Sequence, residues 1–217
     1  MTLKQRPVKK TQSSRKLGSV DEVAPGIDSL IDPAILSTLP PRYRPAIDQA
    51  LMFYRVCENN EGMNYAPVFT TLLGAVEKMV KGLIVRRLQS ELPITADAQK
   101  AWFEPKLCGV PLKLEGSYRD LAKNLKRTLV SNNGQSLIGL LRSCLDYALN
   151  HTTKIDGVFA ALRAQFQVHG GRKLLKTIKR INDFRNTYVA HQEKELTDRN
   201  QAKQELKFWI EALQQLS

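Results

Sequence analysis

Apolar residues recur at three- and four-residue spacing through most of this chain, the pattern of helices that each bury one face. No stretch shows the alternation of apolar and polar residues that a sheet of several strands requires. We therefore expect an all-α fold. The spacing predicts helices over residues 41–57, 67–88, 117–130, 135–150, 155–167, 172–192 and 198–216.

Proline and glycine mark the segments between these helices. Residues 27–42 contain proline-marked breaks and are expected to form an ordered strap or a single helical turn that docks on the core. Residues 89–116 are predicted to be irregular, with Trp102 and Phe103 anchoring the segment in the core or, as the less favoured alternative, stacking on bases. Thr197 is the predicted N-cap of the last helix.

The charge is unevenly distributed. The chain carries a net charge of +12, and six lysines and arginines with no acid lie within residues 1–20. We expect residues 1–26 to be a flexible basic tail, either a solubilising leader or a means of capturing RNA, and residues 27–217 to be a helical domain. A balance this basic favours a polyanionic partner.

Cysteine usage and hydropathy indicate the compartment. Cys57, Cys108 and Cys144 are odd in number and far apart in sequence, which argues against a disulfide framework or a zinc motif. No apolar run approaches 18 residues, so no membrane span is expected. We expect a cytoplasmic protein without a metal or cofactor.

The segment with the clearest chemistry is 172–192, RKLLKTIKRINDFRNTYVAHQ. Its apolar residues form one stripe, and Arg185, Asn186 and His191 fall beside that stripe. On a regular α-helix, Arg185 and His191 would be separated by a rise of about 9 Å and a rotation of about 120°, with Tyr188 between them. A guanidinium and an imidazole so placed can flank one anionic group.

The string FRNTYVAH resembles the Arg-x(4–6)-His signature of HEPN domains (higher eukaryote and prokaryote nucleotide-binding). The resemblance is strongest over residues 67–88 and 172–217. It implies a helical bundle, a homodimer and metal-independent cleavage of RNA, with Arg185 and His191 as the central residues. It also implies a toxin or an antiviral defence effector, with a protein partner or antitoxin that restrains it.

The residue types suit that chemistry, because RNA carries its own nucleophile in the 2′-hydroxyl. His191 can transfer protons near neutral pH, and Arg185 can stabilise charge on the phosphate. Asn186 can orient a reacting group, and Tyr188 can position His191. One histidine does not obviously serve both proton transfers, so we expect two copies of the site to meet in a dimer.

Other interpretations of the same residues stay open. A basic cluster, Arg172, Lys173, Lys176, Lys179 and Arg180, is either a path for the RNA backbone or a solvated helix face. Arg185 and His191 are otherwise a surface pair that holds the following loop through Glu193 or Glu195. The alternatives to a nuclease are a non-catalytic assembly or regulatory module of a defence, restriction or helicase complex, and a basic nucleic-acid-binding protein.

Overall fold

The computed structural model describes residues 31–104, 106–107, 110–111, 117–131, 137–150, 156–190 and 194–215. The predicted flexible tail at residues 1–26 lies outside the described residues, as does His191. The helices and strands are α1 (Pro33–Thr38), η2 (Pro41–Tyr43), α2 (Arg44–Glu58), α3 (Ala66–Val80), η3 (Lys81–Val85), α4 (Arg86–Ser90), α5 (Ala96–Phe103), β1 (Lys106–Leu107), β2 (Val110–Pro111), α6 (Ser117–Ser131), α7 (Leu137–Asn150), α8 (Val158–Val168), α9 (Arg172–Phe184), η4 (Arg185–Ala190) and α10 (Arg199–Gln215).

The fold is all-α, as the apolar spacing predicts. Within the described ranges the extended structure is limited to β1 and β2, two residues each, which pair antiparallel with Leu107 opposite Val110. Buried apolar side chains from α1 through α10 form one connected core. None of the described helices is long and apolar enough to cross a membrane.

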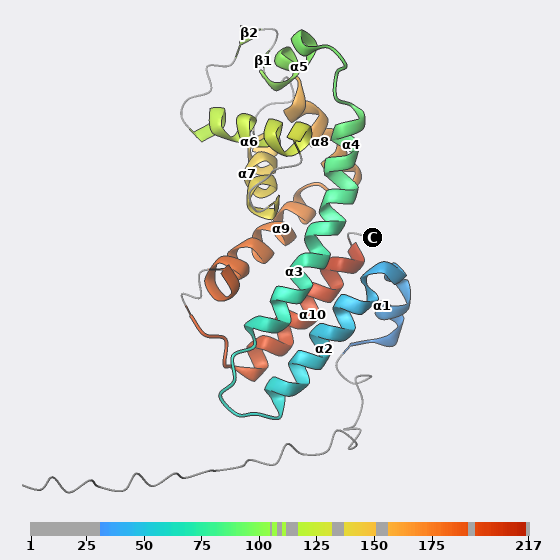
Figure 1. Cartoon of the computed structure of the whole chain (residues 1–217), viewed down its shortest axis with the longest axis vertical. Helices are drawn as coiled ribbons and strands as arrows, with labels where there is room; N and C mark the ends of the chain where they lie inside the picture. The colour runs from blue at the N-terminus through green and yellow to red at the C-terminus, as the bar shows by residue number, and fades with distance from the viewer. Residues whose placement is uncertain are drawn as a thin grey trace, which may run out of the picture.

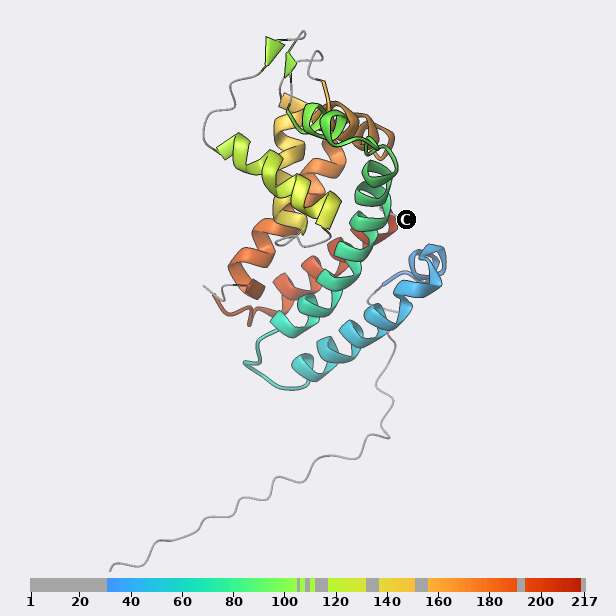
Figure 2. The same ribbon diagram turned by 45° about the horizontal axis from the view of Figure 1, so that its top comes forward.

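The long helix α3–η3–α4 joins the two ends of the molecule (Figure 1). At one end α2 and α10 lie beside α3, and both views show this arrangement (Figures 1 and 2). At the other end α6 and α8 pack against α4, and α7 packs against α6 and α8. Helix α9 leaves this second group, packs against α7 and leads back toward α10. The segment 172–190, which carries most of the FRNTYVAH motif, therefore lies where the two helical groups meet.

Of the two predicted connecting segments, residues 27–42 and 89–116, the first matches its prediction and the second does not. Helix α1 docks on α10 as predicted, and Gln214 Nε2 donates a hydrogen bond to Thr38 Oγ1 at 3.0 Å. The predicted irregular region, in contrast, contains helix α5, whose first turn is capped by Thr95. Phe103 at the end of α5 is buried, which confirms the anchoring of this region in the core.

The position of helix α5 explains why residue 157 is a glycine. Gly157 precedes α8 with a φ of 71°, a conformation that favours glycine. A Cβ at this position would lie 2.4 Å from the carbonyl oxygen of Trp102. The close approach of α5 to the start of α8 therefore requires glycine there.

The predicted cap of the last helix was wrong by one residue. Asp198, not Thr197, precedes α10, and its Oδ1 accepts a hydrogen bond from the backbone N–H of Gln201 at 2.9 Å. A carboxylate also interacts more favourably than a hydroxyl with the positive end of the helix dipole. That charge adds to the capping bond at the start of α10.

The predicted regular helix over 172–192 was also wrong in its second half. Helix α9 ends at Phe184, and residues Arg185–Ala190 form the π-helical turn η4. A π-helix closes i→i+5 hydrogen bonds and is wider than an α-helix, so the α-helical separation expected for Arg185 and His191 does not apply across this turn. π-helical turns are rare and occur frequently at functional sites.

Candidate functional site

An aromatic cluster fixes the start of η4. Phe184, the residue before Arg185, is buried, and its ring centroid lies 4.6 Å from that of Phe69 on α3 and 5.9 Å from that of Trp209 on α10. Phe69 and Trp209 also contact each other, at 5.5 Å. Aromatic pairs at these separations stabilise a core beyond the area that they bury. The backbone that carries Arg185 is therefore anchored on two neighbouring helices.

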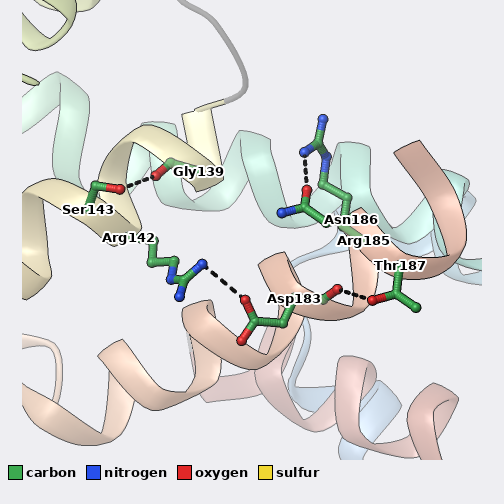
Figure 3. A network of polar contacts seen from close by, with 7 residues as sticks. All are labelled: Gly139, Arg142, Ser143, Asp183, Arg185, Asn186 and Thr187. Carbon is green, nitrogen blue, oxygen red and sulfur yellow. Dashed lines mark hydrogen bonds and ion pairs between the residues drawn. The ribbon is translucent and has the colours of Figure 1, made fainter. Parts of the chain in front are cut away.

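Arg185 and Asn186 form a local pair. The Nη1 of Arg185 donates a hydrogen bond to Asn186 Oδ1 at 2.9 Å. The Nε of Arg185 is buried and has no hydrogen-bond partner among the described residues. Figure 3 shows both side chains projecting from the same side of η4, away from Asp183 and Thr187. The structure thus brings two of the three predicted catalytic residues into contact.

An ion pair joins α7 to the end of α9. Arg142 Nη1 lies 3.0 Å from Asp183 Oδ1 (Figure 3). In the turn that follows, the Thr187 hydroxyl donates to the backbone carbonyl of Asp183 at 3.0 Å. Asp183 is therefore held by a cation that comes from another helix.

A second group of residues lines an open pocket of about 570 Å³ on another side of the segment. Its lining residues are Lys176, Lys179, Arg180, Asp183, Phe184, Thr187, Tyr188 and Lys194. Arg185 and Asn186 are not among them. The Arg185–Asn186 pair is therefore separate from this pocket.

The predicted basic cluster is only partly part of this pocket. Lys176, Lys179 and Arg180 line it, whereas Arg172 and Lys173 are exposed at the start of α9 and do not. Lys194 was missed by the sequence reasoning. Its backbone N–H donates to the carbonyl of Thr187 at 3.2 Å, which brings it back beside η4. Its only signal in the sequence was its charge, close after the motif.

Arg180 is held by α10. Its Nη2 lies 2.6 Å from Glu205 Oε1, and its guanidinium carbon lies 3.8 Å from the centroid of the Phe208 ring. Glu205 is largely buried, with 15% of its side chain exposed. We conclude that Arg180 links α9 to α10 and offers less free charge to a ligand than the neighbouring lysines.

Tyr188 belongs to the pocket. Its ring centroid lies 4.8 Å from that of Phe184, and its hydroxyl accepts a hydrogen bond from Gln201 Nε2 at 3.1 Å. Both ends of the side chain are therefore fixed. The role predicted for Tyr188, positioning His191, stays a prediction because His191 lies outside the described residues.

The chain after the motif is fastened to α2 and α3. The N–H of Tyr65 donates to the carbonyl of Leu196 at 2.8 Å, and Arg199 pairs with Glu58. The pKa of Arg199 is raised, first by its hydrogen bond to Glu58, and burial raises the pKa of Tyr54 and of Tyr65. These contacts fix the position at which the chain enters α10.

The alternative surface pair is not formed through Glu195. In the described part of the chain Arg185 has no ion pair with Glu195, which is exposed; Glu193 lies outside that part. Across the same residues, no three His, Cys, Asp or Glu side chains are grouped so that they could hold a metal ion.

Comparisons with protein-family models, with curated proteins and with solved structures found no match for this chain.

Proposed function

We propose that this protein is a metal-independent endoribonuclease of the HEPN type, in which Arg185 and His191 act on RNA in a site shared by two copies of the chain. The sequence FRNTYVAH supports the proposal. The observation that carries it is the Arg185–Asn186 pair on a π-helical turn, where an amide oxygen fixes one guanidinium nitrogen 2.9 Å away. A guanidinium held in this way is preorganised to bind a phosphate group.

The reaction needs two proton transfers and stabilisation of negative charge. The 2′-oxygen of the RNA attacks the adjacent phosphorus while a base removes its proton, and the bond from phosphorus to the 5′-oxygen breaks as an acid protonates that oxygen. The products are a 2′,3′-cyclic phosphate and a 5′-hydroxyl. His191 is the residue proposed for proton transfer, and Arg185 stabilises the charge on the phosphoryl oxygens.

Asn186 is proposed as a positioning residue. Its Oδ1 accepts from Arg185, which leaves the amide NH₂ group as a further donor beside the guanidinium. A shift of about 1 Å in such a group can reduce a reaction rate by about 100-fold. The pair is therefore expected to act as one unit in catalysis.

Two copies of the site would supply two histidines, one as base and one as acid. In a twofold dimer the same surface patch of both copies forms the interface. An interface at η4 would therefore place both Arg185–Asn186 pairs in one cleft. The sequence resemblance supports this arrangement.

The test is cleavage of labelled tRNA and single-stranded RNA in the presence of EDTA by the wild type, Arg185→Ala and His191→Ala. Lys100→Ala is the matched control, because Lys100 is an exposed cation on α5, remote from α9 (Figure 1). We expect cleavage by the wild type and by Lys100→Ala, cyclic phosphate ends, and at least a 100-fold lower rate for the other two variants.

Equal cleavage by all four proteins would show that a contaminant is responsible. No cleavage by a folded dimer of the wild type would refute the nuclease and favour the non-catalytic assembly module. Circular dichroism and light scattering on each variant establish that it is folded and record its oligomeric state.

A further inference from the structure

The pocket on the other side of the segment is a candidate ligand site of its own. We propose that it binds one nucleotide of a single-stranded nucleic acid, with the phosphate on Lys176, Lys179 and Lys194 and the base against the ring of Tyr188. This goes beyond the proposed function, since it requires neither cleavage nor Arg185. Its volume, about 570 Å³, lies within the range of small-molecule sites and is large enough for a nucleotide.

The charge of the pocket follows from the ion pairs around it. Among the described residues Asp183 is the one acid that lines it, and Arg142, which does not line it, pairs with Asp183 at 3.0 Å. Arg180 is likewise paired with Glu205. These two pairs nearly cancel in charge, so the pocket keeps the charge of its three lysines. Lysine ammonium groups on flexible stems are suited to a phosphate that need not be oriented closely.

The aromatic wall favours a strand whose bases are unpaired. Tyr188 is held between Phe184 and the amide of Gln201, so its ring does not have to be ordered when a base stacks on it. Bases in a duplex are already stacked on each other and do not offer a free face. A lysine-rich pocket with a fixed aromatic ring therefore selects a single strand over a duplex.

The pocket and Arg185 serve different phosphates. Arg185 and Asn186 project from another side of η4 and do not line the pocket (Figure 3). The phosphate proposed on the three lysines is therefore a contact separate from the one proposed for the Arg185–Asn186 pair. We infer that this pocket holds the strand.

The test uses a strand that cannot be cleaved by 2′-hydroxyl attack. A fluorescein-labelled 12-mer of single-stranded DNA is titrated with the full chain in EDTA, and anisotropy gives Kd over a range of KCl concentrations. A phosphate contact to a single strand contributes a slope of about −0.7 in log K against log salt, which amounts to about fivefold in Kd at 0.1 M salt. We expect this loss for each of Lys176→Ala, Lys179→Ala and Lys194→Ala.

Matched variants distinguish binding in the pocket from nonspecific electrostatic attraction. Lys100→Ala should bind within twofold of the wild type. Tyr188→Leu should bind about fivefold more weakly or worse. Tyr188→Phe keeps the ring but loses the hydrogen bond from Gln201, so it should lose less affinity than Tyr188→Leu. The basic residues 1–20 are the same in every variant, so differences among the variants report on the pocket.

Three results would overturn the inference. The first is a loss for Lys100→Ala as large as that for Lys176→Ala, which would indicate nonspecific attraction only. The second is unchanged binding by Tyr188→Leu, which would exclude stacking on that ring. The third is equal affinity for a 12-base-pair duplex, which would exclude selection of a single strand. Because no cleavage is measured, failure here leaves the nuclease test unaffected.

Discussion

Arg180 provides a quantitative test of the division between pocket ligands and structural residues. It was predicted to bind RNA, yet in the structure it pairs with Glu205 at 2.6 Å and lies 3.8 Å from the Phe208 ring centroid. Replacing it with alanine would remove both contacts. It would also leave the Glu205 carboxylate largely buried, with one oxygen, Oε2, already without a hydrogen-bond partner among the described residues.

The expected cost of Arg180→Ala combines these effects. Arg180 is half-exposed, so the ion pair itself contributes about 1 kcal/mol or less. The contact with Phe208 adds about 0.5–1 kcal/mol, and the buried carboxylate that loses its partner costs about 1–3 kcal/mol. The free energy of unfolding should therefore fall by about 1.5–5 kcal/mol, which lowers Tm by about 3–20 °C in a domain of this size.

Thermal and urea unfolding of Arg180→Ala beside Lys179→Ala measures this effect. Lys179 is the adjacent exposed cation of the same pocket, and its substitution should change stability by less than about 0.5 kcal/mol. In a double-mutant cycle, Glu205→Gln should recover about 1 kcal/mol of the loss in the Arg180→Ala background. A change of less than 0.5 kcal/mol for Arg180→Ala would show that the arginine is not a link between α9 and α10, and would return it to the set of free ligands.

Three further predictions concern single residues. Asn186→Ala should lower RNA cleavage by about 10-fold or more with little change in Tm, because Arg185 loses its fixed acceptor; unchanged cleavage would remove Asn186 from the site. Asp198→Ala should cost about 1 kcal/mol in urea unfolding, and Thr197→Ala close to none. Burial raises the pKa of Cys144 from 9.0 to about 12, so its thiol should resist alkylation at pH 8 until the protein unfolds, as peptide mass spectrometry can show. Since the unfolded thiol loses its proton at lower pH than the folded one, stability should fall between pH 9 and 12, and Cys144→Ala should lack that contribution.

The apolar spacing predicted the long helices because each of them buries one continuous face. It missed α5, which has eight residues, lies between prolines and buries mainly Phe103. It also missed the change to a π-helical turn, because the apolar positions Phe184, Tyr188 and Val189 fit an α-helix as well. The turn η4 packs against α3, and Tyr188 accepts a hydrogen bond from Gln201 on α10; local spacing does not encode these contacts.

The candidate site was predictable only in part for a similar reason. Arg185 and Asn186 are neighbours in the sequence and were predicted to lie in one site, and they form a hydrogen bond. The partner of Arg180 lies 25 residues further along the chain, and Lys194 reaches the pocket through the return of the chain to Thr187. Charge alone suggested one continuous basic path toward Arg185. The structure shows instead that the lysines and Arg185 lie on different sides.

Phe184 lies between the Arg185–Asn186 pair and the lysine pocket. Replacing it tests whether both depend on the same aromatic contacts. Its ring contacts Phe69 and Trp209 in the core and Tyr188 at the pocket, and Arg185 follows it directly. Phe184→Leu keeps an apolar side chain but loses these aromatic pairs, at a cost of about 1–2 kcal/mol. The turn that carries Arg185 and the ring that the base stacks on should both become less fixed. We therefore expect Phe184→Leu to reduce RNA cleavage and single-strand affinity together, whereas Asn186→Ala reduces only the first and Lys176→Ala acts mainly on the second. If Phe184→Leu lowered one activity and left the other at the wild-type level, the two sides would not share this support.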